Sequence, residues 1–481
     1  MDLTVRSIVK STIPAVLAAV LLVPPAGGAD RAGRPHGGSV DTENESGVAR
    51  TINVAGPVVD ESSPFFLDLG VNGRRCVTCH EPKNNMTVTP AALRARFAQS
   101  DGKDPIFRTN DGSNSPRADV ATSAARLRAY SMLLTKGVIR VGLPIPANAE
   151  FELASVRDPY RYASSTELSL FRRPLPATNL TFLSTVMWDG RETTRNGDSA
   201  AIHFDLSAQA NDATTGHAGA PKPLDDATRE EIVAYELGLF TAQVFDRRAG
   251  SLTAARAAGG PDELATQPFV FGGNDPLGCN ASAANCTGSN PGFDPAVFTE
   301  FEAWRGARGS DRDRARAAVA RGEELFNTLP IVIKNVSGIN DDFKVAEVRG
   351  TCTTCHDTPH AGDHSVPAPL DIGVADPPMP GTSRNQFGLK VGDMPVYTLR
   401  HKKTGETKVV TDPGRALITG LWKDVGRFKG PILRGLAGRG PYFHNGGAAT
   451  LADVVDFYDK RFDLELTDRQ KSDLEAFLGA L

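Results

Sequence analysis

The sequence lacks the features of several large functional classes. It has no dense run of lysine or arginine and a formal charge of only −4 at pH 7, so a nucleic-acid partner is not expected. After residue 29 no stretch is apolar enough to cross a membrane. Cysteine and histidine are scarce, with six and nine residues in a chain of 481, so each of them can be weighed individually as a site residue.

Residues 1–29 have the pattern of an export signal. Arg6 and Lys10 precede an apolar run from Ile13 to Val23, and small residues end at Ala29. The run is short for a membrane-spanning helix, so cleavage after Ala29 is predicted, with an uncleaved anchor as the alternative. Residues 30–55 are polar and glycine-rich at their start, which indicates a flexible leader. The mature protein is therefore expected in the periplasm.

Four of the cysteines fall in two Cys-x-x-Cys-His motifs, Cys76–His80 and Cys352–His356. In such a motif the two thiols add to the vinyl groups of a haem, and the histidine becomes the proximal ligand of its iron. One motif alone could be half of a zinc site. Two motifs in an exported, otherwise cysteine-poor chain favour two covalently bound haem c groups. The cofactor-binding residues are then Cys76, Cys79 and His80 for haem 1, and Cys352, Cys355 and His356 for haem 2.

The remaining cysteines, Cys279 and Cys286, lie in a loop rich in glycine, asparagine and alanine. Two spare cysteines that close a short loop usually pair in an oxidising compartment. A disulfide between them is therefore predicted, and two free thiols are the alternative.

The length favours two domains, with a boundary in the charged Gly/Arg stretch at 306–313. We expect an N-terminal cytochrome c domain at 56–308 and a C-terminal cytochrome c domain at 309–481, each with one haem motif. Helix signals are frequent and strand signals weak. The predicted fold class is mainly α, as two c-type cytochrome domains with long ordered loops, because glycine and proline are abundant.

Individual helices are expected where capping signals precede amphipathic stretches. Thr89 and Pro90 open one that runs to Gln99, and Asp294 and Pro295 open another that runs through Trp304. Residues 226–245 form a long helix candidate. Capping boxes at 450–453 and 467–470 predict two further helices at the end of the chain.

Three segments together resemble the bacterial dihaem cytochrome c peroxidases and their MauG relatives. They are TVMWDGRE at 185–192, the second haem motif, and PYFHNGGAATLADVVDFYDKRF at 441–462. The resemblance implies two α-helical cytochrome domains, in which the first haem is the peroxide site and the second relays electrons. It also implies a tryptophan between the haems, which is Trp188 in this sequence.

The resemblance further bears on the sixth ligand of the second haem. Peroxidases have a methionine in the helix after PYFHNG, whereas MauG has a tyrosine, and this sequence has Tyr458. Its spacing from Leu451, Val454 and Val455 directs it inward, as would also be true of a plain core tyrosine. Other candidate ligands lie in Pro/Gly loops after the second motif: Met394, the better one, and Met379.

The expected distal residues depart from the family pattern. Gln209 matches a glutamine after WDGR, but no glutamate follows at the expected spacing, and the nearest titratable candidate is His217. A surface histidine is the alternative reading, with His203 the next to consider. Calcium is doubtful, because Arg173 and Arg439 stand where the family places ligands of an inter-haem calcium. These arginines are expected either to pair with haem propionates or to be solvated.

The leading interpretation is a dihaem c-type cytochrome that reduces hydrogen peroxide as cytochrome c peroxidases do. It would act through a high-valent haem iron, with electrons relayed between two haems and supplied by a small redox protein. His217, Gln209 and Trp188 are the expected catalytic residues. The alternatives are a MauG-like oxidase that modifies an oxidisable partner protein, and a non-enzymatic dihaem electron-transfer cytochrome.

Overall fold

The computed structural model describes residues 38–193, 201–278 and 287–481. The predicted export signal and the predicted disulfide between Cys279 and Cys286 both lie outside these residues. The expectation of a mainly α fold is wrong, because 30% of the chain is helical, 16% is strand, and the strands form four small sheets. Two of the strand pairs, β2 with β6 and β4 with β10, join segments far apart in sequence, so local periodicity underestimates them.

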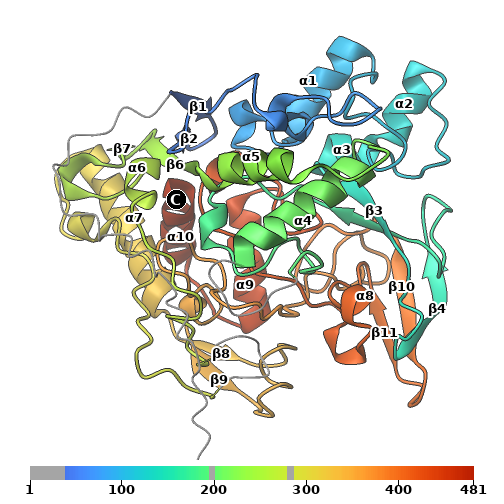
Figure 1. Cartoon of the computed structure of the whole chain (residues 1–481). Helices are drawn as coiled ribbons and strands as arrows, with labels where there is room; N and C mark the ends of the chain where they lie inside the picture. Colours follow the sequence, from blue (N-terminus) through green and yellow to red (C-terminus); the bar gives the residue numbers. More distant parts are fainter. Residues whose placement is uncertain (1–37, 194–200, 279–286) are drawn as a thin grey trace, which may run out of the picture. The chain divides into compact units, whose positions relative to one another are not determined.

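Helices and strands are distributed throughout the described residues (Figure 1). The helices are α1 Pro90–Ser100, α2 Ser123–Ala129, α3 Ser131–Lys136, α4 Ala201–Gly216, α5 Asp226–Leu237, α6 Pro261–Leu264, α7 Asp311–Thr328, α8 Ala416–Thr419, α9 Leu451–Phe462 and α10 Asp468–Ala480. The strands are β1 Ser39–Glu43, β2 Gly47–Asn53, β3 Ile139–Leu143, β4 Phe151–Arg157, β5 Leu168–Arg172, β6 Leu239–Asp246, β7 Gly250–Ser251, β8 Ile331–Ile333, β9 Val348–Gly350, β10 Val396–His401 and β11 Thr407–Val410.

Every sheet is antiparallel, and one of them joins the two halves of the chain. Its order is β11-β10-β4, so a hairpin from the C-terminal half extends along β4 from the N-terminal half, as Figure 1 shows. The core cluster around this sheet contains residues from both halves, among them Phe151, Leu170, Met394 and Phe457. The boundary between 308 and 309 stays a prediction, and this sheet and its core are shared by the two halves.

Three of the predicted helices are confirmed with their caps. Thr89 caps α1, and capping boxes open α9 at Thr450 and α10 at Thr467. The helix expected over 226–245 ends at Leu237, and the rest is β6, which pairs with β2. Its pairing partner β2 lies near the start of the described residues, so the local sequence around β6 does not reveal the strand.

The helix expected over 294–304 is wrong apart from a short 3-10 turn at Glu302–Trp304. Side chains of α7 instead form hydrogen bonds with backbone groups that would have bonded to one another in a helix. Asn327 bonds both the N–H and the carbonyl of Phe298, and Glu323 accepts from the N–H of Phe301 at 2.8 Å. The aromatic side chains of this segment still pack on α7 and α10, which explains their apolar spacing.

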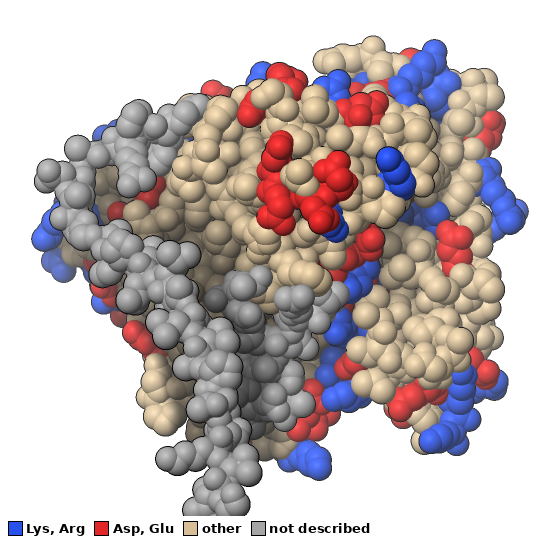
Figure 2. Space-filling view, in the orientation of Figure 1, with Lys and Arg blue, Asp and Glu red and all other residues tan. Residues whose placement is uncertain are grey.

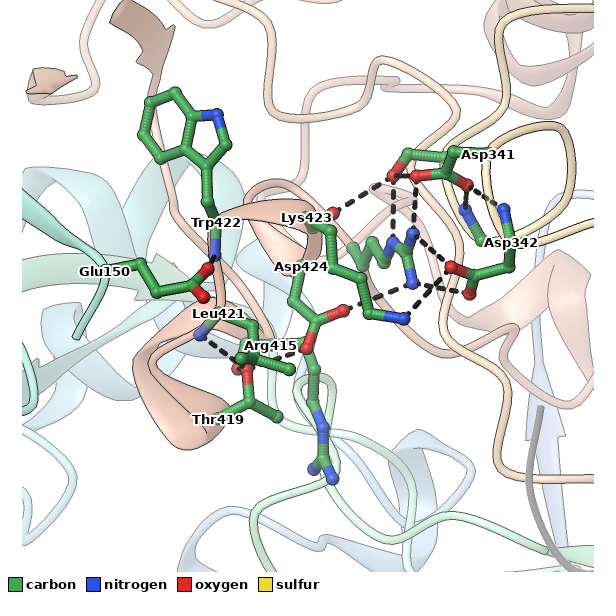
Figure 3. A network of polar contacts seen from close by, with 12 residues as sticks. Glu150, Asp341, Asp342, Arg415, Thr419, Leu421, Trp422, Lys423 and Asp424 are labelled. Atoms are coloured by element: carbon green, nitrogen blue, oxygen red, sulfur yellow. Dashed lines mark hydrogen bonds and ion pairs between the residues drawn. The ribbon is translucent and has the colours of Figure 1, made fainter. Parts of the chain in front are cut away.

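A polar network near α8 ties distant loops together (Figure 3). The buried guanidinium of Arg427 pairs with Asp341, Asp342 and Asp424 at 2.7, 2.9 and 3.2 Å. From the N-terminal half, Glu150 accepts from the N–H of Trp422 at 2.8 Å. These contacts anchor the loop after α8 to the segment before β9 and to the start of β4.

The outer faces of the helices are polar. Figure 2 shows acidic side chains gathered over α5, where Asp225, Asp226, Glu230 and Glu231 are exposed. The opposite face of α5 buries Ile232, Val233, Tyr235 and Glu236. Among the helices within the described ranges, none has the length and apolar composition needed to cross a membrane.

Candidate functional site

The first haem motif folds as a tight turn that presents its histidine. Cys76–Thr78 is a 3-10 turn, and the His80 N–H bonds the Cys76 carbonyl at 2.9 Å. The Nδ1 atom of His80 lies 3.2 Å from the carbonyl oxygen of Met86, to which it can donate its proton. Nε2 is then left without a proton, as an iron ligand must be. Burial lowers the pKa of His80 to about 4, so the ring is neutral at physiological pH.

The second motif repeats this geometry. Cys352–Thr354 is again a 3-10 turn, and the His356 Nδ1 atom lies 2.6 Å from the carbonyl oxygen of Gly362. Burial lowers the pKa of His356 as well. In both motifs a threonine hydroxyl accepts from the N–H three residues earlier, Thr78 from Arg75 and Thr354 from Thr351, each at 2.9 Å. Both histidines are therefore prepared in the same way to bind an iron.

A cavity opens beside the first motif, with about 1570 Å³ of empty space including its mouth. Cys76, Cys79 and His80 line it. The three residues expected to be catalytic, Trp188, Gln209 and His217, line the same cavity. Residues that are far apart in sequence are thus brought to one place that also holds a haem-attachment motif.

The walls of this cavity fit a haem. Most of the lining is apolar, which suits a porphyrin, and the exceptions include buried arginines. In the described structure, Arg439 has no hydrogen-bond partner on Nε and Nη2. Burial lowers the pKa of Arg439 to about 9 and that of Arg173 to about 10. Arg439, buried beside the cavity with unpaired N–H groups, is therefore a suitable partner for the carboxylate of a haem propionate, which favours that expectation over a solvated arginine.

Helix α4 places the two distal candidates. Gln209, Ala213 and His217 stand at i, i+4 and i+8 and share one helical face toward the cavity. His217 directly follows α4, and its N–H bonds the Ala213 carbonyl at 2.8 Å. His203, at the other end of α4, lies 2.9 Å from Glu230 on α5 and is not part of the cavity lining.

Trp188 lies in the cavity wall and contacts the core that connects the two halves. Its Nε1–H donates to the carbonyl of Arg173 at 2.8 Å, and its ring lies 6.3 Å from that of His444. The next residue, Asp189, is buried and paired with Arg172, which also binds Asp412 at 2.7 Å. The WDGR loop is therefore held against the C-terminal half by buried ion pairs.

Tyr458 lies beside the second motif. Its ring centroid is 6.4 Å from that of His356, at an interplanar angle of 68°. Burial, with the Cys355 and Cys352 thiols nearby, raises the pKa of Tyr458 above its usual range. Met394 is only 2% exposed and packs in the core around β10, whereas Met379 is 50% exposed. The position of Tyr458 suits the ligand role, and the exposure of Met379 does not.

The residues at the expected calcium position do not fit a calcium ion. The guanidinium of Arg173 already donates to four backbone carbonyls there: Val88 at 3.0 Å, Arg439 at 2.9 Å, Lys136 at 3.2 Å and Gly137 at 3.3 Å. The carbonyl oxygens that could bind a calcium ion thus already accept hydrogen bonds from the guanidinium cation of Arg173. This agrees with the doubt that the sequence raises about calcium.

Two features of the site were not foreseen. Asp111 lies 2.5 Å from His217, and nothing near it in sequence marks it as a site residue. Glu236 lines the cavity, and burial raises its pKa to about 8. The sequence does contain a signal for Glu236, because it stands four residues after Ile232 on the apolar face of a helix, where an acidic residue is unusual.

The comparisons support the resemblance stated above. A cytochrome-c peroxidase, IdrP1 of Denitromonas iodatirespirans, is 28% identical over 241 residues, which are 46% of this chain and 54% of that protein. IdrP1 of Pseudomonas sp. (strain SCT) is 33% identical over 150 residues, which are 27% of this chain and 36% of that protein. The matched region thus spans about half or less of these relatives. No family model matches the chain.

A solved structure gives a more distant similarity. It is a MauG-like protein associated with microbial copper homeostasis, 16% identical, with a TM-score of 0.31 over 66% of this chain and 77% of that one. The resemblance to the dihaem peroxidase and MauG family is confirmed by the named cytochrome-c peroxidases.

Proposed function

We propose that the chain is a dihaem c-type cytochrome that reduces hydrogen peroxide to water. The observation that carries this proposal is the convergence on one cavity of the first haem motif with Trp188, Gln209 and His217. The relatives named cytochrome-c peroxidase support the same class of reaction.

Residues of the first motif would hold the haem, Cys76 and Cys79 through thioether bonds and His80 through Nε2. A haem held there supplies an iron that binds peroxide and delivers electrons to its O–O bond. His217 accepts a proton from the near oxygen of peroxide and passes it to the far oxygen, so that water can leave. Gln209, on the same helical face, orients the peroxide by hydrogen bonding. The overall reaction consumes two protons and two electrons for each peroxide and yields two waters.

Electrons would enter one at a time from a small redox protein and pass through the second haem. Trp188 lies between the first cavity and the aromatic residues of the C-terminal half. The ring centroid of His444 lies 6.3 Å from that of Trp188, and the ring centroid of Phe443, the residue just before His444, lies 6.4 Å from that of Tyr458. These two ring pairs support Trp188 as the bridge between the two haem sites.

The second candidate function is MauG-like oxidation of residues on a partner protein. It is favoured by one observation, the partly buried Tyr458 beside His356, because an anionic phenolate ligand stabilises oxidised iron. A non-enzymatic electron carrier would need both irons capped by side chains. The cavity beside His80 favours an enzyme over that alternative. In either enzymatic case we propose the periplasm as the location, on the basis of residues 1–29.

The test is an EPR spectrum of the ferric, haem-loaded protein before and after peroxide. We expect a high-spin signal from the first haem that is lost when peroxide is added, while the His401→Ala control behaves as the wild type. His401 lies in β10 and does not line the cavity. A spectrum with only low-spin signals that peroxide leaves unchanged would rule out the peroxidase proposal and identify an electron carrier. Steady-state assays with reduced cytochrome c then separate a peroxidase from a protein-modifying oxidase.

A further inference from the structure

The distal histidine contacts a buried ion pair formed by Asp111 and Arg74. The Nδ1 atom of His217 lies 2.5 Å from Oδ2 of Asp111, and Oδ1 of Asp111 lies 2.5 Å from Nη1 of Arg74. The Arg74 and Asp111 side chains are only 3% and 8% exposed. His217 itself is partly exposed, at 37%, on the side that lines the cavity. One ring nitrogen is therefore held inside the protein, and the other is directed away from the carboxylate.

Arg74 contacts both Asp111 and the backbone carbonyl of His217. Its guanidinium donates to the carbonyls of Pro105 at 2.9 Å, Ile106 at 2.8 Å and His217 at 3.3 Å. The amide of Asn72 also donates to the His217 carbonyl, at 2.7 Å. Because Arg74 stands two residues before Cys76, one short segment contains both the turn of the first haem motif and the arginine that contacts Asp111 and the His217 carbonyl.

Asp111 is ionised in this setting. Burial raises its pKa, but the contacts with His217 and Arg74 outweigh burial and hold the pKa of Asp111 below its usual value. An ionised carboxylate can only accept hydrogen bonds, so the proton between the two groups belongs to Nδ1 of the imidazole. The Nε2 atom of a neutral His217 is then bare and able to accept a proton from a ligand in the cavity.

We propose that Asp111, clamped by Arg74, is a positioning residue that keeps the proton of His217 on Nδ1 and its bare Nε2 in the haem cavity. This inference rests on the proposed function, in which His217 moves a proton between the two oxygens of peroxide. Asp111 remains ionised throughout, because it orients the ring and stabilises the transient imidazolium without taking its proton. The paired group explains how a histidine can replace the expected glutamate.

The decisive variant is Asp111→Asn, which preserves the size of the side chain. Its amide can donate to Nδ1, which moves the imidazole proton to Nε2 and removes the base from the cavity. We expect the second-order reaction of the haem-loaded protein with peroxide to slow by about 10²–10⁴-fold. Asp111→Glu, which keeps a carboxylate, should recover part of this loss. The matched control is Asp104→Asn in the same segment, since Asp104 also pairs with an arginine, Arg96, at 2.5 Å, whereas the contact with His217 belongs to Asp111.

Two readouts separate positioning from a structural effect. Carbon monoxide binds ferrous haem without proton transfer, so its binding rate in Asp111→Asn should stay within about twofold of wild type. Carbethoxylation of His217 by diethyl pyrocarbonate at pH 8, mapped by mass spectrometry, needs a bare and accessible ring nitrogen and no turnover. It should fall at least about fivefold in Asp111→Asn and remain at the wild-type level in Asp104→Asn.

The outcomes are distinguishable. Wild-type reactivity of Asp111→Asn toward both peroxide and diethyl pyrocarbonate would overturn the inference while leaving the proposed function intact. Equal slowing of peroxide and carbon monoxide would also overturn it, because it would show a purely structural role. A wild-type protein that ignores peroxide refutes the proposed function, and the carbethoxylation result then still decides whether Asp111 sets the tautomer of His217.

Discussion

Replacing Arg173 tests the conclusion that a guanidinium stands in the place of calcium. Arg173→Met keeps the length of the side chain but removes its bonds to four carbonyls, of which Val88 and Arg439 are the closest at 3.0 and 2.9 Å. A buried carbonyl left without a partner costs about 1–3 kcal/mol, so two of them cost about 2–6 kcal/mol. Burial also lowers the pKa of Arg173 to about 10, a penalty that the variant relieves. We therefore expect a loss of unfolding free energy near the lower end, about 2–3 kcal/mol.

The assay is urea denaturation of the haem-loaded protein, followed by circular dichroism. Arg94→Met is the matched control, because Arg94 is exposed and donates to one carbonyl only, that of Leu134 at 3.0 Å. A surface change of this kind should alter the free energy of unfolding by about 0.5 kcal/mol or less. If Arg173→Met is as stable as this control, the carbonyl contacts contribute nothing and the reasoning is wrong.

Calcium provides the second arm of the same test. Wild-type stability should not change on adding calcium or a chelator, because Arg173 already occupies the carbonyls. Arg173→Asn supplies the side chain that the related family uses and frees those oxygens. Its stability should then rise with calcium, by about 2.7 kcal/mol at a hundredfold excess over the dissociation constant. A wild-type protein that loses stability in a chelator would refute the assignment.

Three other predictions concern the haems and the buried acid. Pyridine haemochrome should count two haems per chain, and the colour should stay with the denatured protein on a gel; one haem or none contradicts the assignment of both motifs. Tyr458→Phe should change the spectrum of the second haem and raise its potential, whereas the same change in Met394→Leu would transfer the ligand role to methionine. Since burial raises the pKa of Glu236 from 4.5 to about 8, the folded state binds the extra proton between these values, and its contribution to stability is lost as pH rises from about 4.5 to 8. Glu236→Gln should remove this fall, which amounts to at most about 5 kcal/mol, and equal slopes for both proteins in urea titrations at pH 5 and pH 9 would contradict it.

Sequence alone was enough for the features that depend on neighbouring residues. Covalent haem attachment needs two thiols and a histidine at fixed spacing, so both motifs can be recognised in the sequence. The caps of α1, α9 and α10 are local hydrogen bonds within four residues, and they are found where the sequence predicts them. The family resemblance pointed to Trp188 and Gln209, and the lack of the family's glutamate pointed to His217; all three line one cavity, and their catalytic roles stay predictions.

Only the tertiary structure decided which distant groups meet. Asp111 reaches His217 across more than a hundred positions, and Arg173 donates to carbonyls from three separate places along the chain. The strand β6 was mistaken for helix because its partner β2 lies far upstream. Local patterns report the preferences of a segment, whereas pairing, burial and pKa values depend on what other segments place beside it, and that is known only once the chain has folded.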